Sequence, residues 1–433
     1  SRHFEVHCNA TEQLSRRYSR LMEIIRQKLS GMFHSPTSRN LSRSAVFIYC
    51  NQEEFMNNDR YGQWGGRGLG GYYMPSNGSI TTYHGTFGFT GTTFKVLAHE
   101  AVHYYQGLVL KGSGASFDQL PIWLVEGMAV YFGDGSKFDA ERQKITVGLI
   151  PRDRLAHIQE KMLAQRHTPV KKLVKMTRYQ GFNGSHYADA WALIYFLVKS
   201  SKDGEKLMKN YWARGLDRRL APRDFEELAD KYYGGLDKLE EQYISYILRL
   251  NPPSAGVIKG DYFISDDFQF EFRAPGPDWE FFEDGEDKKL LVGLLSPDQK
   301  AQVRVYYENN IYNKEADDYM DEYISQVVEK DGSFEKLRQK KVKISGLPGY
   351  RLMYRDTGKR PASFDVEIKN GRPVFREKKA KKQEPRDIVK FMLVQVDGIA
   401  SIECSVPKGK LKEYRDVFEK MNENFSIALT RRW

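Results

Sequence analysis

The sequence predicts an α+β protein of two domains, the first mostly helical with a small β-sheet near its N-terminus and the second richer in strands. Its 433 residues exceed the usual size of a single domain. Helical periodicity dominates from residue 92 to about residue 250, whereas short β-branched and aromatic runs dominate afterwards. Two prolines and a glycine at 252–256 interrupt the chain between these regions. The expected parts are a first domain at 1–250, a linker at 251–260 and an accessory α+β domain at 261–433.

The N-terminal part combines one helix with a few strands. Apolar residues recur at helical spacing from Leu14 to Leu29, which predicts an amphipathic helix. Residues 44–50 (SAVFIYC) predict a strand, and residues 71–83 predict two strands joined by a Pro-Ser-Asn-Gly turn. The glycines of 66–71 match the spacing GxGxxG, but strands rather than a helix follow them, so we reject nucleotide binding.

The remaining elements follow from the same two periodicities. Helices are expected at 92–110, 121–132, 187–199, 205–213, 222–232 and 236–250. In the accessory domain, strands are expected at 268–273, 290–295, 302–307, 350–354 and 390–396, with helices near 316–329 and 411–421.

Composition excludes several classes of protein. Hydrophobic residues make up 40% of the chain, enough for packed cores, and no apolar run approaches the eighteen residues of a transmembrane helix. The net charge of +10 fits a lysine-rich exterior, and no nucleic-acid-binding motif accompanies it, so we expect no nucleic-acid partner. The three cysteines form no CxxC pair, which argues against a thiolate metal site, and a Cys8–Cys50 bridge stays open. The chain starts at Ser1 without an initiator Met or an apolar leader, which indicates a processed or trimmed sequence; the compartment stays open, and an extracytoplasmic one is favoured.

The chemistry is concentrated in the motif His99-Glu100-Ala101-Val102-His103. Residues four apart share one face of a helix, so both imidazoles can bind the same metal ion. Glu100 lies beside them, placed to take a proton from an activated water molecule. The alternative is a pair of core histidines with polar partners. Burying three polar side chains without a metal is costly, so we expect one zinc ion.

A third metal ligand is expected at Glu126. This residue is the one acid in an otherwise apolar stretch at 121–133 (PIWLVEGMAVYFG), in which Pro121 suits the start of a helix and Gly133 its end. A buried lone carboxylate needs a compensating cation, and catalytic zinc takes three protein ligands with one position open. The small Gly127 would let this helix pack close to the first. The alternative, an exposed glutamate, lacks a polar helix face to support it.

HEAVH followed by WLVEGMAVYF resembles the gluzincin metallopeptidases, in which the glutamate of W-L-x-E-G-x-A is the third zinc ligand. The layout of residues 1–250 is most similar to the bacterial peptidase-MA-like or DUF1570 group. This resemblance implies a zinc peptidase with His99, His103 and Glu126 as ligands and Glu100 as general base. It also implies an oxyanion donor near 184–191, for which Tyr187 is the first candidate and His186 the second, although both could simply pack at a helix start.

Substrate binding is expected at the predicted edge strand within 71–83, because an open strand edge can hold an extended peptide. Tyr72, Tyr73 and Tyr83 are candidate substrate-binding residues, with core packing as the alternative. Related aminopeptidases carry an acid here, and its absence from GYYMPSNG favours an endopeptidase. Residues 111–116 (KGSGAS) suit a mobile loop over the cleft.

The second domain weakly resembles a PsbP/Mog1-like α/β sandwich, through FEFRAPGPDW at 270–279 and a helix at 418–425. Such modules usually bind, so we expect it to dock another protein. For the whole chain we expect a zinc endopeptidase acting on a peptide or protein substrate. The alternative is a catalytically degenerate gluzincin that acts as a binding or scaffold protein.

Overall fold

The chain folds into two compact units. The first comprises residues 1–84, 93–252 and 366–375, and the second comprises 85–92, 253–365 and 376–433, so the main division falls within the predicted linker. The computed structural model describes residues 1–31, 43–65, 69–86, 92–139, 142–265, 268, 270–284, 287, 289–308, 315–325, 334–358, 363–369, 372–378, 383–395 and 398–427.

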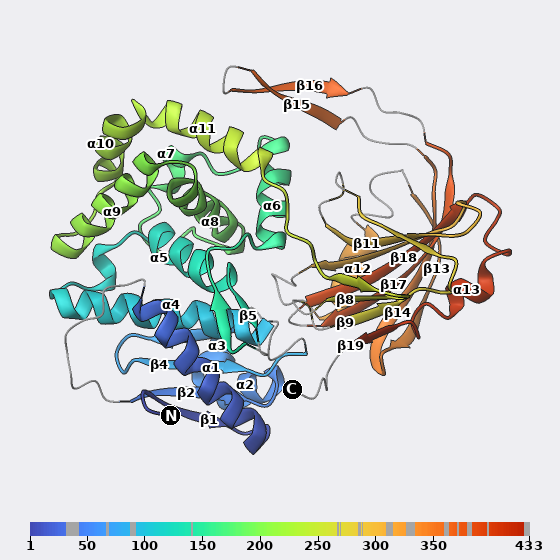
Figure 1. Ribbon diagram of the computed structural model, residues 1–433, viewed down its shortest axis with the longest axis horizontal. Coiled ribbons are helices and arrows are strands. Elements are labelled where there is room, and N and C mark those ends of the chain that lie inside the picture. Colours follow the sequence, from blue (N-terminus) through green and yellow to red (C-terminus); the bar gives the residue numbers. More distant parts are fainter. Residues whose placement is uncertain are drawn as a thin grey trace. The chain divides into compact units, whose positions relative to one another are not determined.

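A four-stranded mixed sheet forms one layer of the first unit, in the order β1-β2-β4-β3 (Figure 1). Its strands are β1 (Phe4–Cys8), β2 (Ser44–Tyr49), β3 (Gly71–Met74) and β4 (Ser79–Tyr83). The first two pairings are parallel, and β3 pairs with β4 as an antiparallel hairpin. The predicted hairpin and its edge strand are therefore confirmed, whereas β1 was not predicted because its burial alternates over only five residues.

Helix α1 (Glu12–Ser30) connects β1 to β2 and confirms the predicted amphipathic helix. The Thr11 side chain accepts a hydrogen bond from the Leu14 backbone N–H and begins the helix. Tyr18, Leu21, Ile25 and Leu29 form its buried face.

Helix α4 (Thr92–Ser113) follows the sheet and runs three residues beyond the predicted end at 110. Lys111, predicted to begin a mobile loop, therefore lies in the last helical turn. Next come η2 (Phe117–Gln119) and α5 (Ile122–Ala129), with Pro121 at the helix start as expected. The predicted stop at Gly133 is wrong, because a π-helical turn η3 (Val130–Asp134) continues through it and Gly135 caps it.

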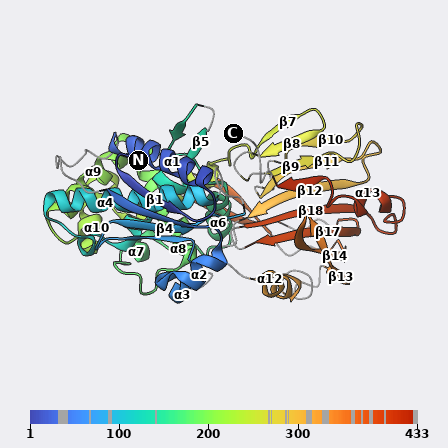
Figure 2. The same cartoon turned by 90° about the horizontal axis from the view of Figure 1, so that it is seen from below.

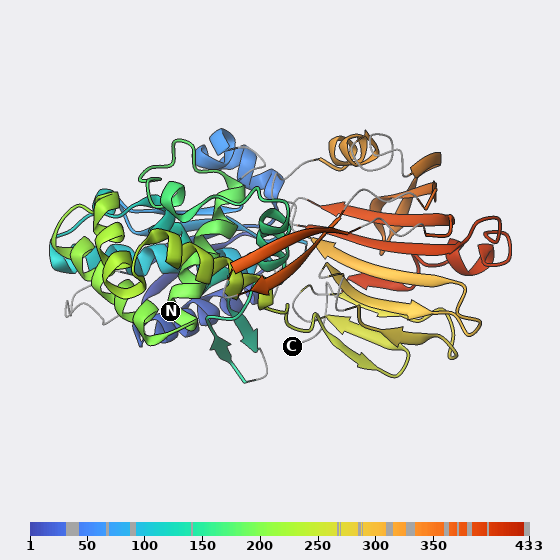
Figure 3. The same ribbon diagram turned by 90° about the horizontal axis from the view of Figure 1, so that it is seen from above.

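A cluster of helices completes the first unit (Figure 3, green). Helix α8 is the centre of this cluster, buried from Ala188 to Leu197 and packed against α5, α6, α9 and α11. The helices are α6 (Arg152–Leu163), α7 (Val170–Leu173), α8 (Gly184–Lys199), α9 (Lys202–Asp217), α10 (Pro222–Tyr233) and α11 (Leu236–Arg249). The smaller elements are α2 (Gln52–Asn58), α3 (Arg60–Gly65), β5 (Lys137–Asp139) and β6 (Lys144–Thr146).

The second unit contains a seven-stranded antiparallel sheet in the order β10-β11-β12-β18-β17-β14-β13 (Figure 2). Its strands are β10 (Glu280–Phe282), β11 (Leu290–Leu295), β12 (Gln302–Glu308), β13 (Phe334–Ile344), β14 (Leu347–Asp356), β17 (Arg386–Gln395) and β18 (Gly398–Pro407). A second sheet contains β7 (Val257–Lys259), β8 (Tyr262–Ser265), β9 (Phe270–Arg273) and β19 (Phe425–Ile427). A separate pair is formed by β15 (Ser363–Lys369) and β16 (Arg372–Lys378), of which residues 366–375 are assigned to the first unit.

Strand β17 shows how the larger sheet is covered on both faces. Phe391 and Leu393 pack in a core shared with Phe270 and Phe272 of the smaller sheet. The alternate residue Met392 packs with α12 (Ala316–Tyr323). One face of the sheet is therefore covered by a helix, and the other by a second sheet and α13 (Arg415–Glu419) rather than by helices alone.

The structure corrects one further sequence prediction, answers one open question and leaves one motif outside the described residues. The helix expected at 418–425 is wrong, because α13 ends at Glu419 and Phe425 begins β19. The bridge left open between Cys8 and Cys50 is not formed, since both are free thiols. The glycines at 66 and 68 of the rejected nucleotide motif lie outside the described residues. Among the helices that the structure describes, none is long and apolar enough to cross a membrane.

Candidate metal centre

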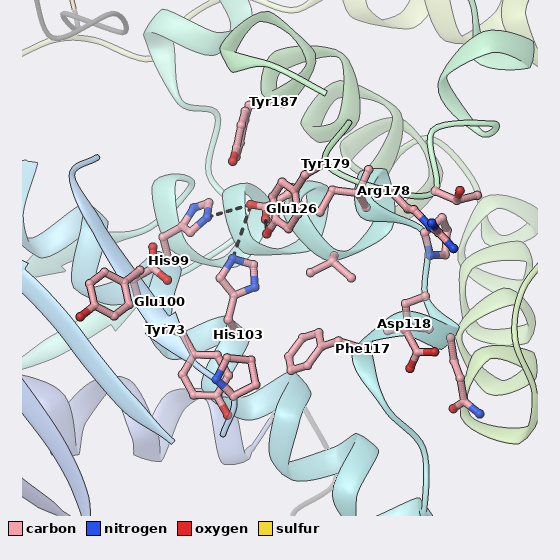
Figure 4. Close-up of a pocket in the computed structure, with 18 of the residues that line it drawn as sticks. Tyr73, His99, Glu100, His103, Phe117, Asp118, Glu126, Arg178, Tyr179 and Tyr187 are labelled. Atoms are coloured by element: carbon pink, nitrogen blue, oxygen red, sulfur yellow. Dashed lines mark hydrogen bonds and ion pairs between the residues drawn. The ribbon is translucent and has the colours of Figure 1, made fainter. Parts of the chain in front are cut away.

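In the first unit, one carboxylate oxygen lies close to two imidazole nitrogens. Glu126 Oε2 lies 3.2 Å from His99 Nε2 and 3.4 Å from His103 Nε2 (Figure 4). These three atoms all lie within 4.8 Å of one another, and no other group of this kind occurs among the residues that the structure describes. The three predicted ligands are thus brought together around one point.

The spacing of these atoms fits a zinc ion. Zinc binds histidine nitrogen at 2.0–2.1 Å and carboxylate oxygen at a similar distance, mostly in tetrahedral geometry. Two ligand atoms of such a tetrahedron are about 3.3 Å apart. The two distances from Glu126 match this value, and two imidazoles with one carboxylate are the donor set of several catalytic zinc enzymes.

Close packing of backbone positions the carboxylate helix against the histidine helix. A Cβ atom added to Gly133 would lie 2.5 Å from His99 Cα, so only glycine lets η3 approach α4 this closely. Gly127 has a different role from the one we predicted. Its nearest neighbours are the Ala190 carbonyl and Ile194, so it allows α5 to approach α8 rather than α4.

Each histidine is held by a polar partner on its other ring nitrogen. His99 Nδ1 lies 3.0 Å from Asp134 Oδ1, and Asp134 in turn pairs with Arg154 at 3.2 Å. His103 Nδ1 lies 2.9 Å from the side-chain oxygen of Gln106, whose amide donates to the Val125 carbonyl at 3.1 Å. Such partners fix the ring orientation and leave both Nε2 atoms facing the shared point.

The carboxylate of Glu126 also has a partner on its second oxygen. The Tyr179 hydroxyl donates a hydrogen bond to Oε1 at 2.5 Å, while Oε2 faces the imidazoles. Tyr179 comes from the loop before α8, and the residue as a whole is 63% exposed. One oxygen of Glu126 is therefore occupied by the protein, which leaves the other for a metal.

The charges of the cluster are mutually stabilising. Burial alone would raise the pKa of Glu126, but His103 and His99 outweigh burial and hold that pKa well below its usual range. Burial would lower the pKa of His99, but the hydrogen bonds to Asp134 and Glu126 raise it well above 6.5. The two imidazoles therefore favour the ionised form of the buried carboxylate.

Glu100 lies at the edge of this cluster and is also buried. Burial raises the pKa of its carboxyl, while the nearby imidazoles of His103 and His99 lower it less strongly. A carboxylate with a raised pKa beside a metal site is suited to accept and return a proton near neutral pH.

A cavity of about 870 Å³ opens beside the three ligands. Glu100, Tyr72 and Tyr73 line it, so two of the three predicted substrate-binding residues lie where a substrate would enter. Tyr83 does not line it. Its ring packs against Phe55 at 5.6 Å between centroids in the core, which makes the packing alternative the correct one for Tyr83.

Tyr187 and His186 are neighbours on α8, but of these two only Tyr187 lines the cavity. Tyr187 lines the cavity, its ring centroid is 6.2 Å from that of His99, and burial raises the pKa of its hydroxyl well above 10. The His186 ring accepts a hydrogen bond from the Asn183 backbone at 3.0 Å and stacks on Phe182, outside the cavity lining. The structure therefore distinguishes the two candidates, and only Tyr187 faces the cluster (Figure 4).

The segment 111–116, expected to form a mobile loop over the cleft, does not line the cavity. Residues 117–122, in η2 and at the start of α5, line it instead. Sequence reasoning also missed Gln106, Asp134 and Tyr179. Gln106 lies one turn after His103 and Asp134 directly follows Gly133, which are the signals that could have identified them.

Two solved structures have limited similarity to this chain. No functionally curated protein matches the sequence. The solution structure of cyanobacterial PsbP from Synechocystis sp. PCC 6803 is similar to 37% of this chain and 86% of that one, at 12% identity and a TM-score of 0.25. A crystal structure from Bacteroides thetaiotaomicron VPI-5482 is similar over 39% of this chain and 49% of its own length, at 18% identity and a TM-score of 0.21. Neither likeness is close enough to assign a fold.

A family match covers the metal centre itself. Residues 94–214 match the family DUF1570, described as a protein of unknown function. This span includes His99, His103 and Glu126 and their partners Asp134 and Tyr179. The candidate metal centre thus lies wholly within the segment that matches this family.

Proposed function

We propose that the protein is a zinc-dependent peptidase of the gluzincin kind that cuts within peptide chains. The observation that carries this proposal is the convergence of His99 Nε2 and His103 Nε2 on one oxygen of Glu126, at 3.2 and 3.4 Å. Those distances suit a tetrahedral ion, and a cavity beside them has room for a substrate. A zinc ion in such a site acts as a Lewis acid and makes water acidic enough to ionise near neutral pH.

Two residues of the chain supply the general base and the oxyanion donor. Glu100, with its raised pKa, accepts a proton from the attacking water and returns it to the leaving amine. Tyr187 keeps its proton because burial raises the pKa of its hydroxyl, so it can donate a hydrogen bond to the developing oxyanion.

The edge strand β3 supports peptide binding. Strand β4 pairs with one side of β3, and β3 is the last strand of its sheet. Tyr72 and Tyr73 of this strand line the cavity, so an extended chain added along β3 would pass the metal centre. The turn that follows β3 carries no acid to hold a free amine, which favours an endopeptidase over an aminopeptidase.

The test combines metal analysis with cleavage. We expect one zinc per chain, and digestion of a peptide library that a chelator stops and zinc restores. Glu100→Gln should keep the zinc and lose cleavage, because it removes the base but none of the ligands. Protein that binds zinc and cleaves no member of a broad library would favour the degenerate, scaffold alternative. The docking role of the accessory domain and the extracytoplasmic location stay predictions.

A further inference from the structure

The cavity carries positive charge away from the metal ligands. Arg178 and Arg219 both line it, together with Asp118. Figure 4 shows Arg178 extending along the cavity from Tyr179, away from Glu100 and His99. The cavity therefore has a carboxylate-rich end at the ligands and an arginine-bearing end beyond them.

The two arginines are not equivalent. Arg219 forms an ion pair with Asp118, and Asp118 also accepts a hydrogen bond from the Ser116 hydroxyl. No hydrogen bond or ion pair engages the Arg178 guanidinium within the part of the chain that the structure describes. One positive charge in the cavity wall is thus left without a protein counter-charge.

Arg178 is also tied to the metal centre through its neighbour. The Tyr179 hydroxyl is bonded to Glu126 Oε1 at 2.5 Å, which anchors the loop at that point. Consecutive Cα atoms are about 3.8 Å apart, and an extended peptide advances about 3.3 Å per residue. A group bound by Arg178 would therefore belong to a substrate residue within a few positions of the bond at the metal centre.

We propose that Arg178 is a specificity residue that binds a carboxylate of the peptide substrate. A guanidinium offers paired N–H donors that match the two oxygens of a carboxylate. Arg178 is exposed and lines the same cavity as the apolar residues Phe117, Leu120 and Ile122, so its guanidinium is accessible to a substrate. This inference rests on the proposed peptidase function and adds its substrate class, peptides with an acidic group near the cleaved bond.

The carboxylate can come from an aspartate or glutamate side chain or from the free C-terminus of the peptide. Both present the same chemistry to Arg178, and a peptide series separates them. The series places Glu or Gln at each position around one cleavable bond, with the C-terminus either free or amidated. A kcat/KM that falls when the C-terminus is amidated identifies the terminal carboxylate as the group bound. A kcat/KM that falls when Glu is replaced by Gln identifies a side-chain carboxylate.

The test measures kcat/KM over this series for the zinc-loaded protein and three variants. We expect about a tenfold preference for the carboxylate-bearing peptide, given the strength of charge-assisted hydrogen bonds at a partly exposed site. Arg178→Gln should abolish the preference. Asp118→Asn should increase it, because it releases the Arg219 guanidinium. The matched control Lys175→Gln removes one exposed charge outside the cavity and should leave the preference unchanged.

Binding of the same peptides to the Glu100→Gln protein separates this inference from the proposed function. Equal affinity for Glu and Gln peptides and for free and amidated ends would overturn the role of Arg178, even if the wild-type protein cleaves them all. A preference that survives Arg178→Gln would overturn it as well. Carboxylate-dependent binding that Arg178→Gln removes, without cleavage by the wild-type protein, would support the binding site and reject the peptidase.

Discussion

Asp134 Oδ1 lies 3.0 Å from His99 Nδ1, although the two residues are 35 positions apart. The contact requires η3 to turn back onto α4, which Gly133 permits by its lack of a side chain. This packing places the Asp134 carboxylate beside a candidate ligand of the metal centre.

Replacing Asp134 by Asn should weaken zinc binding about tenfold to a hundredfold, as is usual when the partner of a ligating histidine loses its charge. The zinc dissociation constant, measured by competition with a chromophoric chelator, reports the change. Asp203→Asn is the control, because Asp203 is an exposed residue of α9 that pairs with Lys206. Equal affinities of Asp134→Asn and wild-type protein would contradict a supporting role for this carboxylate.

Replacing Gly133 by Ala should destabilise the metal-free protein by about 1–3 kcal/mol, the usual range for overpacking. The added Cβ would lie 2.5 Å from His99 Cα and 2.6 Å from its nitrogen, so one backbone must move. Urea unfolding followed by circular dichroism measures the loss. Gly31→Ala should cost little, because the nearest atom to its Cβ is 3.5 Å away. Similar midpoints for both variants would show that η3 does not constrain α4.

The stabilisation conferred by zinc should grow as the pH rises. Burial would lower the pKa of His99, but Asp134 and Glu126 raise it well above 6.5 in the metal-free fold. Protonated His99 therefore stabilises that fold fully below about pH 6.5, and the contribution is lost as the pH rises through the folded pKa. Zinc needs the neutral ring, so its affinity increases over the same interval. Thermal unfolding with and without zinc should show a larger shift in Tm at about pH 8 than at about pH 6, and a shift that falls with pH would refute the assignment.

Replacing Tyr187 by Phe should lower kcat about a hundredfold to a thousandfold and leave the zinc content unchanged, if its hydroxyl stabilises the oxyanion. Tyr179→Phe provides the comparison, because the Tyr179 hydroxyl contacts the ligand Glu126. That variant should bind zinc more weakly and therefore lose activity. Added zinc should restore the activity. Zinc titrations combined with steady-state kinetics distinguish the two patterns, and an exchange of the two phenotypes would assign the oxyanion role to Tyr179.

The sequence by itself determined the features that depend on local periodicity. His99 and His103 share a face because residues four apart on a helix must do so, and Glu126 is buried because its helix is apolar all round. The β3–β4 hairpin likewise follows from a turn between two strand-forming runs.

Only the tertiary structure decided which groups from distant segments complete the centre. Tyr83 and Tyr73 belong to the same hairpin, yet Tyr83 on the inner strand β4 packs against Phe55, whereas Tyr73 on the edge strand β3 lines the cavity. Asp134 and Tyr179 reach His99 and Glu126 because α4, α5 and the loop before α8 pack together. Contacts of this kind depend on the relative placement of whole elements, which no local periodicity encodes.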